Sequence, residues 1–284
     1  MEFLRAASVD EALAAARDGA AFVAGGTNLV PDVLFGRKKI SRAVDISRLD
    51  ELRYIEEADG KIRIGALATV TDLLDSDLIR TAASPLHESA LEFAGPLVRN
   101  RASVAGNLMD ASPAADLAPP LLAQDAIVEL VSVEGERALP LSEFFLDYRK
   151  TAVRPEELVT AIVIDPLGAE DRCAYYKLQL RRAMAIAVVG VAVVLRMNRG
   201  VCAEAVIGLG AVAAIPYRAH AAEAHLRGKE IGEVEIESAA AAAADSAQPI
   251  DDVRASASYR RKMCGVLVRR MLRKAMGMPQ TVAV

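Results

Sequence analysis

The chain contains few of the residues that build metal centres or disulfides. Of its 284 residues, three are cysteine and three are histidine. The cysteines are far apart without CxxC spacing, and the histidines form no HExxH motif. This spacing excludes a disulfide framework and a self-contained zinc or iron–sulfur site. We expect Cys173, Cys202 and Cys264 to be buried thiols, because free cysteine is commonly buried, and we expect no metal to be bound by this chain.

Long apolar runs and an excess of charge of one sign are also absent. The best apolar run, Ile186 to Leu195, is shorter than the ~18 residues of a membrane span and is typical of a buried strand. The N-terminus lacks a basic segment followed by an apolar one, so we expect no secretion signal and a cytoplasmic protein. The formal net charge of -4 gives no basic field for nucleic acid or an anionic membrane.

The residues that are present suffice for two or three globular units. The sequence is 53% hydrophobic and 25% charged, and domains commonly hold roughly 100–200 residues. Short strands and short helices are mixed up to residue 168. Beyond it, three long strands are followed by helices, which indicates a separate α+β domain. We therefore expect an α+β protein with units at residues 1–50, 51–168 and 169–284.

Local signals place the main elements. Ser8 and Glu11 form a capping box that opens a helix over Val9 to Arg17. The dipeptide Asp59-Gly60 predicts a hairpin, because both residues tolerate positive φ. Long strands are expected at 173–180, 186–197 and 201–209, and the later helices at 216–226, 236–246 and 256–276.

Two glycine motifs carry the functional information. The first, Ala24-Gly25-Gly26-Thr27-Asn28-Leu29, directly follows a short apolar strand, and the second is Ser103-Val104-Ala105-Gly106-Asn107-Leu108. Glycine lets the main chain approach a ligand, and consecutive N–H groups form a concave anion site. Together the two turns suggest a diphosphate held from two sides. The first motif alone is equally compatible with a strand-to-helix connection that binds no ligand.

Neither motif is one of the common nucleotide-binding loops. Gly25 and Gly26 are adjacent, so the first motif is not a GxGxxG fingerprint, and no lysine follows the glycines as it does in a P-loop. The residues by themselves therefore indicate an unspecified ligand that carries phosphate.

Four ordered blocks make the chain resemble a known family. AGGTNL, ASVAGNLMDASPAADLAP, DYRKTAVRPEEL and DDVRASASYRRKM together resemble the FAD-binding medium subunit of the xanthine dehydrogenase and carbon monoxide dehydrogenase family of molybdenum hydroxylases. The resemblance runs from about Phe3 to Arg273. It implies a two-subdomain FAD-binding fold of the vanillyl-alcohol oxidase (PCMH) type, followed by a small α+β domain with a three-stranded antiparallel sheet and helices.

The resemblance implies a set of contacts to non-covalent FAD. The first motif would wrap the diphosphate through Phe22, Val23, Ala24, Gly25, Gly26, Thr27, Asn28 and Leu29. The second would contribute Ser103, Val104, Ala105, Gly106 and Asn107. The family usually has two glycines before this asparagine. This chain has Ala105 in the first place, a small change that we expect to leave cofactor binding intact.

Four further positions match family contacts. Phe93 and Val159 would be apolar contacts, Asp116 a hydrogen-bonding carboxylate, and Lys177 a cation near the flavin that raises its potential. Without the resemblance, these residues would be interpreted as core, strand, helix cap and solvated charge. Charged residues in the same blocks are interpreted as loop or interface charges: Arg149, Lys150, Arg181 and Arg182.

The resemblance also implies how the work is divided among subunits. This chain would be an FAD-carrying electron-transfer subunit of an oxidoreductase, without a catalytic acid or base of its own. Molybdopterin and 2Fe-2S clusters would lie in a large and a small partner subunit, within a dimer of heterotrimers. NAD, a quinone or another small molecule would accept the electrons. A stand-alone flavoprotein of the same fold and a cofactor-free scaffold subunit are the alternatives.

Overall fold

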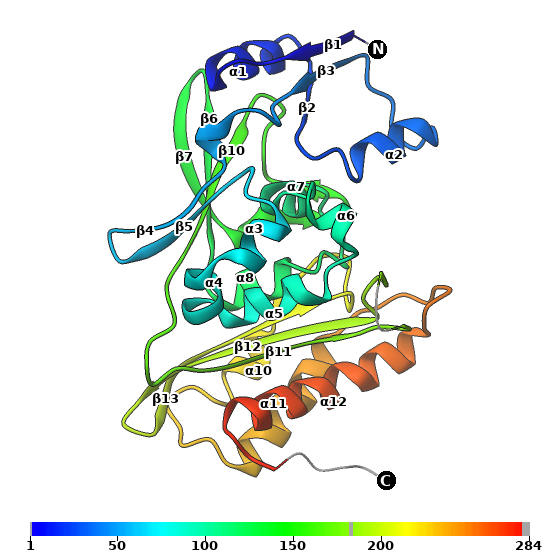
Figure 1. Cartoon of the computed structure of the whole chain (residues 1–284). Helices are drawn as coiled ribbons and strands as arrows, with labels where there is room; N and C mark the ends of the chain where they lie inside the picture. The colour runs from blue at the N-terminus through cyan, green and yellow to red at the C-terminus, as the bar shows by residue number, and fades with distance from the viewer. Residues whose placement is uncertain (1, 182–183, 280–284) are drawn as a thin grey trace.

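Three sheets of three or more strands follow one another along the described part of the chain. The computed structural model describes residues 2–181 and 184–279, with the N-terminal sheet at the top of Figure 1 and the C-terminal helices at the bottom. Each sheet belongs to one of the three expected units. Arg182 lies outside the described residues. The division at residues 50 and 168 stays a proposal.

The first sheet is small and parallel. Its order is β1-β3-β2, and the capped helix α1 connects β1 to β2 as predicted, with Ser8 Oγ accepting the N–H of Glu11. Its core is completed by Leu67 and Leu158, which come from the second unit. The elements of this part are β1 (Glu2–Arg5), α1 (Val9–Arg17), β2 (Ala21–Val23), α2 (Leu29–Leu34), β3 (Arg42–Asp45) and the 3-10 helix η1 (Asp50–Leu52).

The second sheet is antiparallel and has five strands in the order β4-β5-β10-β6-β7. The predicted hairpin is confirmed, because Asp59 and Gly60 both have left-handed φ, 52° and 71°. A bulge interrupts β10 between Val159 and Ala161. The strands are β4 (Ile55–Ala58), β5 (Lys61–Gly65), β6 (Ile127–Ser132), β7 (Gly135–Pro140) and β10 (Leu158–Ile164).

Short helices lie between the second and third sheets (Figure 1). Their apolar sides form one large core with the second sheet, in which Leu86, Leu121 and Ile162 are fully buried. These helices are α3 (Val70–Asp75), α4 (Asp77–Ala82), α5 (Ser84–Glu92), α6 (Pro96–Arg99), α7 (Val104–Met109), α8 (Ala118–Ala123) and α9 (Leu141–Phe144). After them comes the hairpin of β8 (Phe145–Asp147) and β9 (Lys150–Thr151).

The third sheet is covered on both faces. Helices α5 and α8 pack on one face and α12 on the other, with α11 beside α12 (Figure 1). Strand β12 contains most of the apolar run from residue 186 to 195, because both faces of this strand are buried. Val191 and Val193 belong to the α12 side, whereas Ala192 and Val194 belong to the α8 side. The elements are β11 (Arg172–Leu178), β12 (Val189–Asn198), β13 (Val201–Gly210), β14 (Tyr217–Arg218), α10 (His220–Glu223), α11 (Glu233–Ser246) and α12 (Ala257–Ala275).

The third sheet departs from the prediction at one edge. The three long strands and the last two helices are confirmed, but Tyr217 and Arg218 add a fourth strand by pairing with β13. The helix predicted over 216–226 is therefore wrong at its start, and only His220–Glu223 is helical. Arg218 is held by Glu223 and Asp125, so tertiary contacts override the helix propensity of this alanine-rich segment. Strand β1 was not predicted.

A buried arginine ties α12 to the third sheet. Arg260 donates from Nη1 to the carbonyl oxygens of Val188 and Ala211, both at 3.0 Å. Its Nη2 donates to Asp252 Oδ1 at 2.6 Å, and Asp252 also accepts from Arg254. Burial opposes ionisation of Asp252, but the hydrogen bonds from the two arginines outweigh it and hold its pKa well below the usual value.

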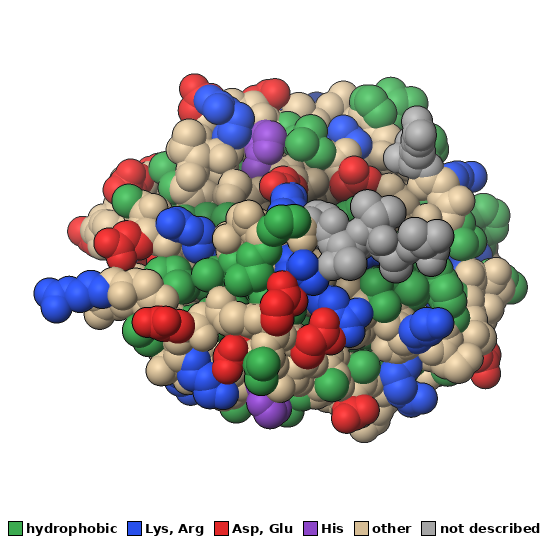
Figure 2. All heavy atoms as spheres, turned by 90° about the horizontal axis from the view of Figure 1, so that it is seen from below, with side chains coloured by type: hydrophobic (Ala, Val, Ile, Leu, Met, Phe, Trp, Pro, Cys, Tyr) green, Lys and Arg blue, Asp and Glu red, His purple; other side chains and the backbone are tan. Residues whose placement is uncertain are grey.

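Positive and negative side chains are interspersed on the face formed by α11 and α12, which Figure 2 shows from below. Two ion pairs connect the helices there, Arg269 with Glu237 and Arg273 with Glu233. This face therefore carries no field of one sign. Among the helices that the structure describes, none combines the length and the apolarity of a membrane span.

We expect Asp252→Asn to lower the free energy of unfolding by about 3 kcal/mol, because the buried guanidinium of Arg260 loses its counter-charge. The pKa of Asp252 is lower in the folded than in the unfolded state. Its stabilisation is thus present above about pH 4 and lost as the pH falls further. Urea denaturation between about pH 7 and about pH 3 measures this.

The control for this experiment is Asp245→Asn, which changes an exposed carboxylate on α11. Equal stabilities of wild type, Asp252→Asn and Asp245→Asn at neutral pH would contradict the assigned role of Asp252.

Candidate functional site

The first glycine motif is the loop between β2 and α2. A Cβ built on Gly25 would overlap the carbonyl oxygen of Arg101, and Arg101 Nε donates to the Gly25 carbonyl at 3.2 Å. Only a residue without a side chain permits this approach. The loop therefore contacts the segment just before the second motif. This brings the two motifs together, as their pairing in the sequence predicts.

The same loop presents a row of unpaired backbone donors. Within residues 2–181 and 184–279, the N–H groups of residues 25–29 donate to no protein acceptor, whereas the N–H of Val30 donates to the Gly26 carbonyl. Most of these residues are only half-buried, and Asn28 is exposed. Consecutive unpaired N–H groups at the start of a helix are an arrangement that binds phosphate oxygens.

The second motif is a helix start, and its prediction as a turn was wrong. Ser103 caps α7, with its Oγ accepting the N–H of Gly106. The N–H of Val104 donates to Ala68, and that of Asn107 to Ser103. Serine is a strong helix cap, so this segment uses most of its backbone donors internally. Its contribution to a ligand must come mainly from side chains.

Side-chain donors and one acceptor are available on this side. Ser103 Oγ accepts one hydrogen bond, and Asn107 Oδ1 accepts the N–H of Leu117 at 3.3 Å. Both residues therefore keep donor groups without a protein acceptor in the described part of the chain. Asp116 Oδ1 is buried and has no hydrogen-bond partner among the described residues. Such an atom is rare in native proteins unless a ligand or water binds it.

Lys177 forms a buried ion pair with Asp116. Its Nζ donates to Asp116 Oδ2 at 2.7 Å and to the Glu92 carbonyl at 3.0 Å, and only 3% of the residue is exposed. Burial raises the pKa of Asp116 to about 6, and the charge of Lys177 opposes this rise. Lys177 is thus no solvated charge. It joins β11 of the third sheet to the segment between α7 and α8.

The apolar candidates are divided between two cores. Phe93 and Val159 are 8% and 5% exposed and share a cluster with Val104 and Ala105. Val159 lies at the bulge of β10. Phe22 and Ala24 pack at the border of the N-terminal core, and Val23 pairs with Asp45 of β3. Gly25 thus meets the segment before the second motif, Phe93 and Val159 share a core with that motif, and Lys177 reaches Asp116 from the third unit.

Two charged residues near the first motif, Arg101 and Asp32, were not predicted from the sequence. Arg101 contacts Gly25 as described, and Asp32 of α2 receives Arg149 Nη1 at 2.7 Å. Arg149 lies in the turn between β8 and β9, as a loop charge would, and its interpretation as an interface charge stays a prediction. Lys150 and Arg181 are exposed. The positions of Arg101 directly before the second motif and of Arg149 in the DYRK block were the available signals.

The three thiols do not take part in this site. Cys202 and Cys264 are buried as predicted, and burial raises their pKa values to about 11 and about 12. The prediction is wrong for Cys173, which is only partly buried. Cys173 lies on the strand face covered by α5, where its Sγ is 3.2 Å from Ser84 Oγ.

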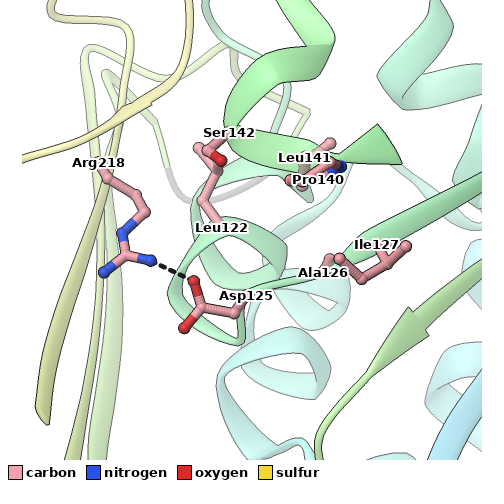
Figure 3. Close-up of a pocket in the computed structure, with 8 residues that line it drawn as sticks. All are labelled: Leu122, Asp125, Ala126, Ile127, Pro140, Leu141, Ser142 and Arg218. Atoms are coloured by element: carbon pink, nitrogen blue, oxygen red, sulfur yellow. Dashed lines mark hydrogen bonds and ion pairs between the residues drawn. The ribbon is translucent and has the colours of Figure 1, made fainter. Parts of the chain in front are cut away.

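Two recesses lie in the described part of the chain, and the larger of them is lined in part by Ala68, whose carbonyl accepts the N–H of Val104 in the second motif. One of about 110 Å³ separates the second unit from β14 and is lined by Leu122, Pro140 and the ion-paired Asp125 and Arg218 (Figure 3). The other, about 380 Å³, lies beside the Arg53–Asp72 ion pair. Their charged groups are already paired within the chain, and neither contains a predicted cofactor residue. Both are interpreted as gaps between packed elements.

Comparison with known proteins gives the ligand. Residues 1–166 match the family described as "FAD binding domain in molybdopterin dehydrogenase", and residues 174–275 match "CO dehydrogenase flavoprotein C-terminal domain". The chain belongs to the FAD-binding subunits of molybdopterin dehydrogenases. This confirms the predicted fold class, FAD as the cofactor, and the assignment to an oxidoreductase.

Individual relatives agree over nearly the full length. The chain is 34% identical over 282 residues to the 6-hydroxypseudooxynicotine dehydrogenase complex subunit alpha of Paenarthrobacter nicotinovorans, covering 97% of this chain and 94% of the relative. It is 30% identical over 256 residues to the carbon monoxide dehydrogenase medium chain of Hydrogenophaga pseudoflava, covering 90% and 89%. The solved carbon monoxide dehydrogenase of that organism lacking the Mo-pyranopterin moiety matches with a TM-score of 0.94 and 32% identity, covering 98% of this chain and 97% of that one.

We expect Gly25→Ala to reduce bound FAD at least about tenfold and to cost about 1–3 kcal/mol of stability, because the new methyl overlaps Arg101. Flavin absorbance of the purified chain and thermal unfolding measure the two effects. Gly168→Ala is the matched control, since its Cβ would have no neighbour closer than 3.4 Å. Normal FAD content in Gly25→Ala would refute the close approach.

Proposed function

We propose that the chain holds FAD between the loop of residues 25–29 and α7, and relays electrons from a partner's 2Fe-2S clusters to an external acceptor. The observation that carries the proposal is the row of unpaired N–H groups in that loop, pressed against the segment before α7. A diphosphate needs several donors at once, and this loop supplies them without side-chain charge.

Each candidate residue has a role in this proposal. The loop N–H groups bind the diphosphate, and Ser103 and Asn107 donate from the α7 side. Phe93 and Val159 form apolar walls that exclude water. Asp116 Oδ1 accepts a hydrogen bond from a hydroxyl or N–H of the cofactor, which supplies the redox chemistry when bound by exchanging electrons singly or in pairs.

Partners follow from the relatives' names. One relative is a subunit of a dehydrogenase complex and another is the medium chain of carbon monoxide dehydrogenase. We propose a large molybdopterin-binding subunit and a small 2Fe-2S subunit as partners, in a dimer of heterotrimers. NAD, a quinone or another small molecule would accept the electrons. A cytoplasmic location stays a prediction.

The two alternatives fit the site less well. Stand-alone flavoproteins of this fold often tether flavin through histidine, cysteine or tyrosine, and the two glycine motifs contain none of these. A cofactor-free scaffold gives no reason for the unpaired loop donors or for the unpartnered Asp116 Oδ1. Both features are explained by non-covalent FAD.

Native purification from cells that express the chain tests the function. We expect FAD, molybdenum and iron to co-purify with it in a complex with two further polypeptides. Addition of the complex's reducing substrate should then bleach the flavin absorbance before the external acceptor is added. Isolation of the chain alone with full turnover would favour the stand-alone flavoprotein, and isolation without any flavin would favour the scaffold.

We expect Lys177→Met to lower the flavin midpoint potential by roughly 30 mV, because the reduced, anionic flavin loses a nearby cation. The pairing with Asp116 keeps the shift smaller than a lone cation would give. Redox titration of the bound flavin measures it, with Lys61→Met as control because Lys61 is half-exposed and paired with Asp165. Identical potentials for wild type and Lys177→Met would rule out this role.

A further inference from the structure

An ion pair of its one buried residue connects helix α2 to the rest of the chain. Asp32 is its only buried residue, whereas its apolar Val30 and Leu34, and Phe35 just after it, are exposed. A surface helix normally buries an apolar stripe. Because α2 directly follows the loop of residues 25–29, whatever holds α2 also fixes that loop.

The partner of Asp32 is Arg149, in the turn between β8 and β9. Arg149 Nη1 donates to Asp32 Oδ2 at 2.7 Å and lies 3.7 Å from Asp110 Oδ1 at the end of α7. The carboxylates are 9% and 12% exposed. Arg37 is a second, more distant partner of Asp32, at 3.6 Å with 69% of its side chain exposed. One guanidinium therefore joins the helix after the first motif to the helix that contains the second.

The backbone at Arg149 is unusual in the same place. Arg149 has a left-handed φ of 54°, and its N–H donates to the carbonyl of Ala111, which has a φ of 46°. Turns of this kind normally place glycine or asparagine at such a position. Left-handed backbone costs energy for a residue with a Cβ, and it is kept where the side chain has a use. Here the strained backbone points the guanidinium between α2 and α7.

We propose that Arg149 is a positioning residue that latches α2 to α7 through Asp32 and Asp110 and thereby sets how long FAD stays bound. The inference rests on the proposed function. In this proposal Arg149 does not contact the cofactor and acts only through α2 and the loop before it. With the latch broken, only half-buried apolar residues hold α2 in place, because none of its apolar side chains is fully buried. The loop of residues 25–29 then loses its fixed row of donors.

The test compares FAD dissociation rates of the full-length holoprotein, followed by the recovery of flavin fluorescence after dilution. We expect Arg149→Met to release FAD at least about tenfold faster, since a charge-assisted hydrogen bond to a buried carboxylate is lost. Arg149→Lys should restore part of the retention. Arg37→Met, which removes the distant and exposed partner of the same carboxylate, should change the rate less than about twofold.

A second variant separates the latch from folding. Arg149→Gly removes the guanidinium but relieves the left-handed backbone, so we expect the apoprotein to keep its melting temperature while FAD leaves as fast as from Arg149→Met. When Arg149→Gly is combined with Asp32→Asn, the effects of the two substitutions on the FAD dissociation rate should not add, because both remove the same ion pair.

Two results overturn the latch and are distinguishable. FAD release from Arg149→Met and Arg149→Gly within about twofold of wild type would show that Arg149 does not position the loop, with FAD binding itself intact. A wild-type chain that binds no FAD at all would overturn the proposed function and the latch together.

Discussion

The contact between the Gly25 backbone and the Arg101 carbonyl is the constraint on which the site depends. It fixes the loop of residues 25–29 of the N-terminal unit against Arg101, just before α7 in the second unit. No hydrophobic side chain contributes to this contact, so its strength comes from shape and from hydrogen bonds. The N-terminal core also crosses the junction of these two units, because Leu67 and Leu158 of the second unit complete it. Apolar packing therefore holds the first two units together beside the junction at which we propose that the cofactor binds.

The third unit reaches Asp116 through a buried cation. Lys177 extends from β11 and satisfies Asp116 and the Glu92 carbonyl, so the position of the C-terminal sheet is coupled to the carboxylate proposed to face the cofactor. The coupling also explains why Asp116 can be buried with one oxygen unpaired. Its other oxygen is neutralised by Lys177, which reduces the cost of burial. Under the proposed function, the C-terminal unit would act on the flavin environment through Lys177.

The sequence predicted those features that depend on neighbouring residues. The Ser8 cap of α1 and the Asp59-Gly60 hairpin are local, and both were confirmed. The other half of the predicted capping box was wrong, because Glu11 accepts the N–H of Ala7 instead of that of Ser8. The resemblance located the motifs because their order along the chain is itself a signal. Interactions between distant residues were invisible: Asp32 and Arg149 are 117 positions apart, and β14 forms only because β13 offers an edge. The second motif was misjudged because its serine can serve a helix as well as a ligand.

The composition of the N-terminal core has a consequence for folding during synthesis. Leu158 belongs to that core although it follows Leu52 by about a hundred residues. The first sheet therefore leaves the ribosome with an apolar gap that later segments, including β10, fill. Contacts over such a sequence separation form late. The loop of residues 25–29, which we propose binds the cofactor, is translated early, and we expect it to reach its final place only when the second sheet is complete. Flavin insertion is thus expected to follow translation of the first two units, with no earlier intermediate able to retain it.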